Sequence, residues 1–366
     1  MAKLIDLIVG ARPNFVKIAA IICAIKKVQI AEVQLNYRLI HTGQHYDSNM
    51  SQEFFTQLNI PEPDINLQVG SGTQSEQTGA IMISYEKLLL NSPSHLCLVV
   101  GDVTSTMACA ITAQKNGVRV AHVEAGIRSG DWSMPEEINR IVTDSITDWF
   151  FTTSESASRN LHKEGVSWDR IFFVGNTMID TLLLNKNRLS PPAFWKTLGL
   201  KNEEFIVLTL HRPSNVDQYE SFSKLLHSIG EQSRGLPVVF PAHPRTIKTL
   251  SQIGALPSNI FQVEPQPYLQ FTYLLKRAKL VITDSGGITE EATVLKIPCI
   301  TLRDSTERPE TVTVGTNELI GSNPVALTPY LDRLFTGKWK KGLIPDKWDG
   351  KASERIVGQL SKLLCD

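Results

Sequence analysis

The sequence has no excess of charge of either sign, and this absence excludes a broad class of partners. Its 366 residues contain 37 lysines and arginines against 37 aspartates and glutamates. A protein that binds nucleic acid or an anionic membrane through a wide surface needs an excess of positive charge there. We therefore expect no nucleic-acid partner and no membrane partner.

Cysteine is scarce, and several familiar site patterns are missing. The five cysteines form no CxxC pair, and most lie in apolar runs such as residues 96–100. Neither HxH nor HExxH occurs, so we expect no metal. No GxGxxG follows the first predicted strand, so we expect no dinucleotide cofactor. Dispersed, reduced cysteines and the lack of a signal-like N-terminal segment predict a cytoplasmic protein.

Long apolar runs are absent as well, since no uninterrupted stretch reaches the length of about 18 residues that crosses a membrane. Instead, short β-rich runs alternate with helical patterns, which is typical of parallel sheets flanked by helices. The predicted strands are residues 4–9, 38–41, 96–100, 119–123, 149–152 and 171–174, then 205–210, 238–240, 260–263, 280–283 and 299–302.

Two sets of strands predict an α/β fold with two doubly wound parallel-sheet domains. We place the first domain at residues 1–175 and the second at residues 176–351. The tail, residues 352–366, has apolar residues at helical spacing and is expected to return to the first domain. Ligands of such sheets bind beyond the carboxyl ends of the strands, so two facing edges would form a cleft.

Two carboxylates follow apolar strands in the first predicted domain. Asp102 comes after residues 96–100, and Glu124 comes after residues 119–123. Carboxylates at adjacent strand ends can raise each other's pKa, which suits a general acid or base working near neutral pH. We predict that both act in catalysis.

An anion site is predicted in the second domain, at Asp284-Ser285-Gly286-Gly287 between a strand and a helix. Glycines let the backbone approach a diphosphate, and a helix N-terminus favours an anion. A plain turn with an N-capping aspartate is the alternative. On the helix that follows, Glu290 is predicted to point away from the buried face. Glu291 is predicted to point partly inward, toward ribose hydroxyls or a neighbouring arginine.

Two further segments allow both a structural and a functional reading. Ser133-Met134-Pro135-Glu136 has the form of a helix-capping box. On the helix that follows, Ile138 belongs to the predicted buried stripe, whereas Glu136 and Arg140 are predicted to form a solvated ion pair on the opposite side. His211 directly follows the predicted strand at residues 205–210. It could donate a hydrogen bond to a leaving phosphate, or it could have a purely structural role.

Nine short segments in order resemble the non-hydrolysing UDP-N-acetylglucosamine 2-epimerase family over nearly the whole chain. The segments are Gly10-Ala11-Arg12-Pro13, Thr42-Gly43-Gln44-His45, Gly101-Asp102, residues 122–128 (HVEAGIR), residues 135–140 (PEEINR), Gly175-Asn176-Thr177, His211-Arg212, residues 284–288 with Glu290-Glu291, and Thr306-Glu307-Arg308-Pro309-Glu310. The resemblance implies a GT-B arrangement, with the last helix crossing back to the first domain.

The chemistry that this resemblance implies is inversion at C2 of the sugar, without NAD or metal. Loss of the C2 proton accompanies loss of UDP from C1 and leaves 2-acetamidoglucal, and re-addition of UDP with protonation of the opposite face gives the ManNAc configuration. The ligand is a UDP-sugar, the product is a precursor of surface polysaccharides, and we also expect a homodimer. The implied catalytic residues are Asp102, Glu124, Glu136, Arg140 and His211, and the implied UDP-binding residues are Arg12, His243, Ser285, Gly286, Gly287, Glu291 and Arg308.

The chain departs from the common pattern at two loops. It reads GARPN at residues 10–14 and HRPSN at residues 211–215, where many bacterial members read GTRPE and HRREN. The second loop therefore lacks a guanidinium and a carboxylate, so we do not expect activation by a second UDP-sugar. A related epimerase acting on UDP-2,3-diacetamido-glucuronate would present nearly the same motifs and stays open as an alternative.

Three other functions are alternatives to the non-hydrolysing epimerase. A hydrolysing epimerase would release ManNAc and UDP, and the intact segment 135–140 favours the non-hydrolysing branch instead. A glycosyltransferase of the same fold, or a non-catalytic UDP-sugar sensor, needs no carboxylates flanking C2. The three carboxylates Asp102, Glu124 and Glu136 count against the glycosyltransferase, whereas a sensor would bind through Ser285-Gly286-Gly287 and be indifferent to loss of Glu124.

Overall fold

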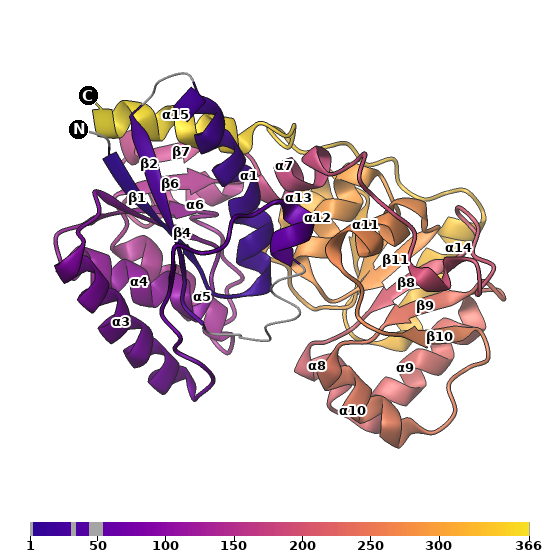
Figure 1. Ribbon diagram of the computed structural model, residues 1–366. Coiled ribbons are helices and arrows are strands. Elements are labelled where there is room, and N and C mark those ends of the chain that lie inside the picture. Colours follow the sequence, from indigo (N-terminus) through magenta and orange to yellow (C-terminus); the bar gives the residue numbers. More distant parts are fainter. Residues whose placement is uncertain (1–2, 31–33, 44–53, 366) are drawn as a thin grey trace. The chain divides into compact units, whose positions relative to one another are not determined.

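The computed structural model of the chain describes residues 3–30, 34–43 and 54–365 (Figure 1). The side chains of Arg12, Pro244, Pro324 and Cys365 lie outside this description. The chain divides into two compact units, of which unit 1 comprises Met1–Leu184 with Asp346–Asp366 and unit 2 comprises Asn185–Pro345.

Unit 1 contains a parallel sheet of seven strands in the order β3-β2-β1-β4-β5-β6-β7. Its strands are β1 (Lys3–Val9), β2 (Leu35–His41), β3 (Ile65–Asn66), β4 (Leu96–Val100), β5 (Arg119–Val123), β6 (Trp149–Thr152) and β7 (Ile171–Phe173). Its helices are α1 (Arg12–Ile30), α3 (Gln74–Asn91), α4 (Thr104–Lys115), α5 (Pro135–Ser145), α6 (Glu155–Lys163), η1 (Trp168–Arg170), α7 (Thr177–Leu184) and α15 (Ala352–Cys365).

Unit 2 repeats the plan with six parallel strands in the order β10-β9-β8-β11-β12-β13. Its strands are β8 (Ile206–Thr209), β9 (Val238–Pro241), β10 (Ile260–Val263), β11 (Leu280–Thr283), β12 (Cys299–Thr301) and β13 (Asn317–Leu319). Its helices are η2 (Ala193–Trp195), α8 (Pro213–Val216), α9 (Tyr219–Gln232), α10 (Pro244–Ile253), α11 (Tyr268–Arg277), α12 (Gly286–Leu295), α13 (Pro309–Thr313), η3 (Pro324–Leu327) and α14 (Thr328–Phe335).

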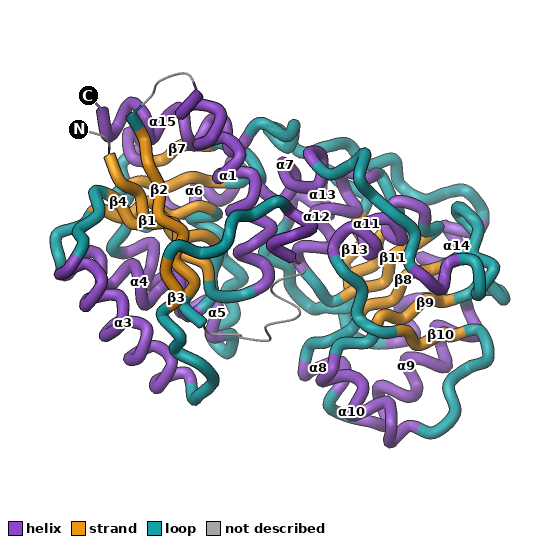
Figure 2. Tube along the Cα trace, in the orientation of Figure 1, coloured by secondary structure: helices purple, strands orange, loops and turns teal. Residues whose placement is uncertain are grey.

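Each sheet is buried between helices, which explains why its strands read as continuous apolar runs. All five residues of β4 are buried, and so are all four of β11. Figure 2 shows the strands of each unit covered by helices. The predicted fold class, two parallel sheets flanked by helices, is confirmed. The edge strands β3 and β13 were not predicted.

The C-terminal helix α15 is part of unit 1 and is attached to α7. Asp180 of α7 accepts hydrogen bonds from Ala352 N at 3.1 Å and from Ser353 N and Oγ, both at 2.6 Å. Thr181 Oγ1 on the same helix donates to Val16 O of α1 at 2.6 Å. These bonds hold α7 in unit 1, so the division between the units falls after Leu184 rather than at residue 175.

Candidate active site

The predicted carboxylates Asp102 and Glu124 lie at the carboxyl ends of neighbouring strands. Val100, the last residue of β4, pairs with Val123, the last residue of β5. Gly101 N donates to Val123 O at 3.0 Å, which ties the two strand ends together. The structure therefore brings Asp102 and Glu124 to one edge of the unit 1 sheet.

Glu124 occupies a backbone conformation that non-glycine residues rarely adopt. Its φ is +72°, in the left-handed region, and the residue is only 3% exposed. Such conformations cost about 1–3 kcal/mol each and are concentrated at functional sites. Lys17 Nζ of α1 donates to Glu124 Oε2, and both side chains are buried. Glu124 is therefore a buried, partnered carboxylate at a strained strand end.

Lys17 is a site residue that the sequence analysis did not identify. A Cβ added to Gly101, whose φ is +68°, would lie 2.6 Å from Lys17 Nζ, so glycine leaves the space that the ammonium group fills. In the sequence Lys17 stands between Val16 and Ile18, both of which are buried. A lysine inside such an apolar run was the available indication that its charge has a buried partner.

Asp102 keeps part of its side chain exposed and is held by α5. Arg140 donates to Asp102 Oδ2 from Nε at 3.0 Å and from Nη2 at 2.5 Å. Asn139 Nδ2 donates to Asp102 O at 2.9 Å. The Asp102 side chain is 23% exposed, so it is fixed in position and still accessible to a small ligand.

Helix α5 turns a polar face to the interior, which contradicts the sequence prediction. Arg140 is 3% exposed and Ile138 is 43% exposed, so the predicted solvated position of Arg140 is wrong. Arg140 also donates to Glu137 Oε2 at 2.8 Å, and Glu137 Oε1 accepts from Ser129 N at 3.0 Å and Gly130 N at 2.9 Å. Polar side chains can be buried here because their partners are buried with them.

The start of α5 also differs from the prediction. Met134 is the N-cap and makes no side-chain capping hydrogen bond, so the predicted capping box is wrong. Ser133 Oγ donates instead to Asp131 Oδ1 at 2.6 Å. Glu136 is exposed in the first turn of α5, whereas Arg140, one turn later, is buried. The two residues therefore do not form the solvated surface pair that was expected.

In unit 2, Asp284 organises the carboxyl ends of β8 and β11. It is completely buried and accepts from His211 N at 3.0 Å, Arg212 N at 2.9 Å and Asn215 Nδ2 at 3.1 Å. His211 Nδ1 lies 2.8 Å from Asp284 Oδ1. Burial opposes ionisation of Asp284, but the hydrogen bonds, first that of His211, hold its pKa below its ordinary value. Asp284 is thus the anionic group that orients the half-exposed imidazole of His211.

The predicted anion site is the N-terminus of α12. The first backbone N–H groups of a helix have no partner inside it, and the N-cap Ser285 makes no side-chain hydrogen bond to them. Gly286 and Gly287 add no side chain at this end. Backbone N–H groups and the positive end of the helix dipole can therefore meet a phosphate.

Three charged residues to which the sequence analysis gave no role lie near this helix end. A Cβ added to Gly286 would lie 3.2 Å from Glu307 Oε1. Glu307 Oε2 is 2.7 Å from Arg303 Nη1, and Glu307 Oε1 is 3.7 Å from Arg212 Nη2. Arg212 Nε also donates to Asp284 O at 3.1 Å. Two guanidinium groups near a helix N-terminus favour an anion with several phosphate oxygens.

Glu291 points inward, as predicted, and its partner is a tyrosine. Tyr268 Oη donates to Glu291 Oε1 at 2.9 Å. Burial raises the pKa of Glu291 to about 7, and the hydrogen bond from Tyr268 offsets only part of that effect. A carboxylate with this pKa changes its charge near neutral pH.

The prediction for Glu290 is wrong. Glu290 is completely buried, and Arg308 Nε donates to its Oε1 at 2.5 Å. The ion pair compensates the burial of both charges. Arg308, which was predicted to bind UDP, is therefore engaged with α12 and is itself 6% exposed.

His243 and Arg12 are the remaining residues predicted to bind UDP. His243 is the N-cap of α10, where its Nδ1 accepts from Arg245 N at 3.3 Å, and its ring centroid is 6.3 Å from that of His211. Arg12 begins α1, but its side chain lies outside the described residues, as do Gln44 and His45.

Two parallel sheets flanked by helices, with polar groups at the carboxyl ends of their strands, define a protein of the GT-B fold class. The sequence model of the UDP-N-acetylglucosamine 2-epimerase family matches residues 27–361. The chain belongs to the UDP-N-acetylglucosamine 2-epimerase family, whose members are isomerases, and the predicted family and enzyme class are confirmed.

Individual relatives cover nearly the whole chain. The UDP-N-acetylglucosamine 2-epimerase of Methanocaldococcus jannaschii is 43% identical over 96% of this chain and 97% of its own. A crystal structure of the M. jannaschii enzyme with UDP-GlcNAc and UDP has a TM-score of 0.87 at 40% identity, covering 98% of this chain and 99% of that one. The UDP-2,3-diacetamido-2,3-dideoxy-D-glucuronate 2-epimerase of Pseudomonas aeruginosa is 39% identical over 97% of this chain and 99% of its own.

The described part of the chain has neither a candidate metal site nor a helix that could span a membrane. No group of three or more His, Cys, Asp or Glu side chains among residues 3–30, 34–43 and 54–365 is arranged to hold a metal ion. None of the helices built from these residues has the length and apolar character needed to cross a membrane.

Proposed function

We propose that the protein is a non-hydrolysing epimerase that interconverts UDP-GlcNAc and UDP-ManNAc. The observation that carries this proposal is the pair of partnered carboxylates at adjacent strand ends, Asp102 with Arg140 and Glu124 with Lys17. Inversion at C2 needs acid and base groups that can serve both faces of the ring. The name and 43% identity of the M. jannaschii relative support the substrate.

In this reaction a carboxylate takes the proton from C2 while the bond between C1 and the UDP oxygen breaks. The C2–H electron pair forms the C1=C2 double bond of 2-acetamidoglucal, and the pair of the breaking bond leaves with UDP. UDP then adds back at C1, and a second carboxyl group protonates C2 from the other face. Asp102 and Glu124 are the proposed acid and base groups, and Glu136, exposed in the first turn of α5, is the proposed third carboxylate.

All the groups that bind UDP in this proposal, except Arg12 of α1, belong to unit 2. The diphosphate meets the N-terminus of α12, and His211, oriented by Asp284, donates to the departing oxygen. Glu291 accepts hydrogen bonds from the ribose hydroxyls. The full set of proposed UDP-binding residues is Arg12, His243, Ser285, Gly286, Gly287, Glu291 and Arg308, to which we add Arg212 and Arg303 beside Glu307.

The 2-epimerase reaction on UDP-2,3-diacetamido-glucuronate is the second candidate. The P. aeruginosa relative named for that substrate is 39% identical over 97% of this chain, only slightly below the M. jannaschii relative. Turnover of the glucuronate at a kcat/KM at least about tenfold above that of UDP-GlcNAc would favour this candidate.

The deciding experiment is incubation with UDP-GlcNAc in deuterated water, with C2 followed by NMR. Deuterium at C2 of a sugar that still carries UDP, in both epimers, is the expected result. Free ManNAc and UDP would indicate a hydrolysing epimerase. Unlabelled, unchanged sugar would exclude both epimerase reactions on this substrate and leave the glycosyltransferase and the sensor.

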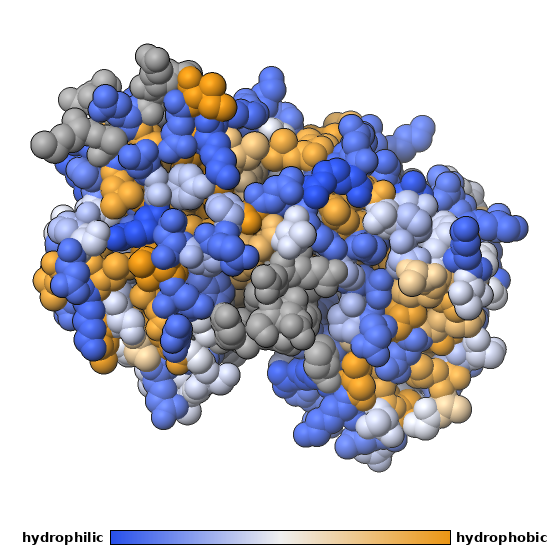
Figure 3. Space-filling model, viewed as in Figure 1, coloured by the Kyte–Doolittle hydropathy of each residue, from blue (hydrophilic) through white to orange (hydrophobic). Residues whose placement is uncertain are grey.

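We also propose that the enzyme is a homodimer that uses an exposed apolar face of unit 1. On α3, Ile83 is 57% exposed and Leu90, two turns later, is 71% exposed. Figure 3 shows hydrophobic residues interspersed with hydrophilic ones along this helix. Light scattering after gel filtration should give twice the mass of the 40.7 kDa chain, and Ile83→Glu with Leu90→Glu should give the monomer. A monomeric wild type would contradict the proposal.

A cytoplasmic location and a role in supplying precursors for surface polysaccharides complete the proposal. Cys97, Cys109 and Cys299 are free, buried thiols, which is usual for proteins of a reducing compartment. Cell fractionation tests the location. Deletion of the coding sequence should remove ManNAc-derived sugars from surface polysaccharide, and unchanged sugar content would contradict this role.

A further inference from the structure

We propose that Asp144 and His122 form a buried hub that positions the loops carrying Asp102 and Glu124. This inference rests on the proposed function, because the two loops matter through the proton transfers assigned to them. Asp144 and His122 are positioning residues, since their own contacts are with protein groups rather than with a reacting atom.

Asp144, on α5, holds the turn that follows Glu124. Its Oδ2 accepts from Gly126 N at 3.0 Å and from Arg128 Nη1 at 2.7 Å. Gly126 has a φ of +77°, and a Cβ there would lie 2.3 Å from Ala157 O, so the turn has little room to shift. The carboxylate of Asp144 therefore fixes the backbone two residues after Glu124.

His122 extends the hub to the other loop. It lies in β5, is completely buried, and has its Nδ1 2.7 Å from Asp144 Oδ1. Its Nε2 lies 2.8 Å from Gly101 O, and because a carbonyl oxygen can only accept, Nε2 carries the hydrogen. Gly101 is the left-handed residue directly before Asp102. One imidazole ring thus connects Asp144 to the peptide that carries Asp102.

Helix α5, which bears Asp144, also holds Asp102 directly. Asn139 Nδ2 binds Asp102 O, and the Arg140 guanidinium binds Asp102 Oδ2. The backbone before Asp102, its own carbonyl and its carboxylate are therefore all tied to α5, directly or through His122. The same helix reaches the Glu124 loop through Asp144, so one rigid element sets the position of both carboxylates.

Folding alone gives little reason for this arrangement. Buried charges need full pairing, and replacing a buried ion pair with apolar residues of similar volume is often neutral or stabilising. Burial opposes ionisation of Asp144, but its contacts, first that with His122, hold its pKa below the ordinary value. Arg128 in turn binds Glu164 with Nη2 2.6 Å from Oε2, so one guanidinium bridges the two carboxylates. The network instead fixes the positions of the two loops that carry Asp102 and Glu124.

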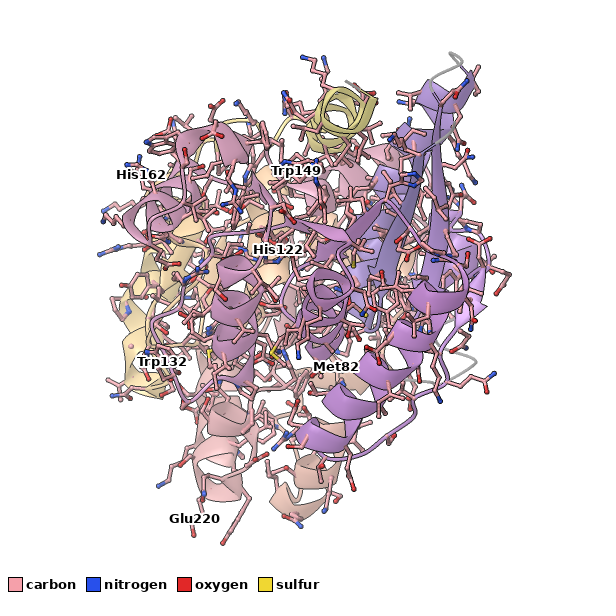
Figure 4. The ribbon with its side chains drawn as sticks, turned by 90° about the vertical axis from the view of Figure 1, so that its left-hand side faces the viewer. Met82, His122, Trp132, Trp149, His162 and Glu220 are labelled. Carbon is pink, nitrogen blue, oxygen red and sulfur yellow. The ribbon has the colours of Figure 1, made fainter. Side chains whose placement is uncertain are left out.

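Conservative variants separate the two links of the hub. In His122→Asn the amide nitrogen lies near the former Nδ1 and can still reach Asp144, but the link to Gly101 O is lost. In His122→Gln the amide nitrogen lies near the former Nε2 and can still reach Gly101 O. Asp144→Asn keeps the size of the side chain and removes its charge. His162→Asn is the matched control, because it makes the same change at an exposed histidine. Figure 4 shows His162 at the edge of the view and His122 near its centre.

The measurements are kcat and KM for UDP-GlcNAc, the Kd of UDP, and the melting temperature. A displacement of about 1 Å can reduce turnover by about 10²-fold, so we expect Asp144→Asn and His122→Asn to lower kcat by about that factor. The Kd of UDP should stay within about twofold, because all the proposed UDP groups except Arg12 lie in unit 2. His122→Gln should keep at least about tenfold more activity than His122→Asn. His162→Asn should match the wild type.

Two results would overturn the hub. One is a kcat within twofold of wild type in all three variants, and the other is a parallel loss of kcat and UDP affinity in both His122 variants, which indicates general unfolding. If Asp144→Asn does not fold, the contrast between His122→Gln and His122→Asn decides alone.

An inactive wild type would refute the proposed function and not the hub. In that case amide exchange at Gly126 provides the test, since its N–H should exchange about tenfold faster in Asp144→Asn than in wild type. Unchanged exchange would overturn the hub.

Discussion

Arg140 binds Asp102 through two nitrogen atoms that converge on one oxygen. Nε is 3.0 Å and Nη2 is 2.5 Å from Asp102 Oδ2, while Nη1 of the same guanidinium binds Glu137. A planar guanidinium can make all three contacts at once, whereas the single ammonium group of lysine cannot. The orientation of Asp102 therefore depends on arginine at this position and not only on a positive charge.

Arg140→Lys is accordingly expected to lower kcat by about 10–10²-fold, because Asp102 loses its fixed orientation while a cation remains. Steady-state kinetics measure the change, and circular dichroism with the Kd of UDP serve as controls for folding and for unit 2. A kcat equal to that of wild type would show that charge alone suffices.

The pair formed by Lys17 and Glu124 predicts a coupling that stability measurements can detect. Removing one member of a buried ion pair leaves a buried charge without its partner and costs about 3–5 kcal/mol. Lys17→Met should lower the free energy of unfolding by that amount in urea denaturation. The double variant Lys17→Met with Glu124→Gln should lose clearly less than the sum of the two single losses.

Lys26→Met is the control for this cycle, because Lys26 lies on the same helix and is exposed. It should change the free energy of unfolding by less than about 0.5 kcal/mol. Additive losses in the Lys17 and Glu124 variants would mean that the two side chains are not coupled.

Much of the fold could be predicted because each buried parallel strand is an uninterrupted apolar run. β4, β5, β6, β10 and β11 have the predicted limits. The edge strands β3 and β13 have only two and three residues, too few to form a recognisable run.

The site was harder to predict, because the helical-wheel argument assigns polar residues to solvent. Arg140 and Glu290 are buried because Asp102 and Arg308 meet them in the interior, and such pairing is not visible along the sequence. Lys17 escaped notice for the same reason, since its partner Glu124 is 107 residues away in the chain.

The raised pKa of Glu291 predicts that UDP binding depends on pH. In the ligand-free protein burial brings this pKa to about 7, so the protonated form predominates below that pH. Ribose hydroxyls donate to the ionised carboxylate, so binding and ionisation favour each other. If only the ionised form binds, the affinity for UDP rises about tenfold between pH 6 and pH 8. Calorimetric titration over this range measures it.

Glu291→Gln is the control for this pH dependence, since it removes the titrating group and leaves the ionisation of UDP itself unchanged. The slope of affinity against pH should be smaller in this variant. The effect of pH on the free energy of unfolding has the opposite sign. The stability that the raised pKa of Glu291 contributes is fully present below the ordinary pKa of a glutamate, and it is lost as the pH rises through 7. Equal pH slopes for wild type and Glu291→Gln would contradict the role given to this carboxylate.

The attachment of α15 gives a prediction on stability that is independent of catalysis. Asp180 accepts from two backbone N–H groups and one hydroxyl at the start of α15. Asp180→Ala removes this cap, and the loss of a capping side chain costs about 0.5–2 kcal/mol. The free energy of unfolding should fall by this amount with kcat unchanged. An unchanged free energy of unfolding would show that α15 is held by its apolar face alone.

Exchange of the C2 proton with solvent tests the roles of the two partnered carboxylates most directly. The measurement is the rate of deuterium incorporation at C2 of UDP-GlcNAc in Glu124→Gln beside wild type, with the Kd of UDP determined for both. The predicted result is a rate lower by about 10²-fold or more at a nearly unchanged Kd. Exchange at the wild-type rate, or a loss of UDP binding in place of a loss of exchange, would contradict a proton-transfer role for Glu124.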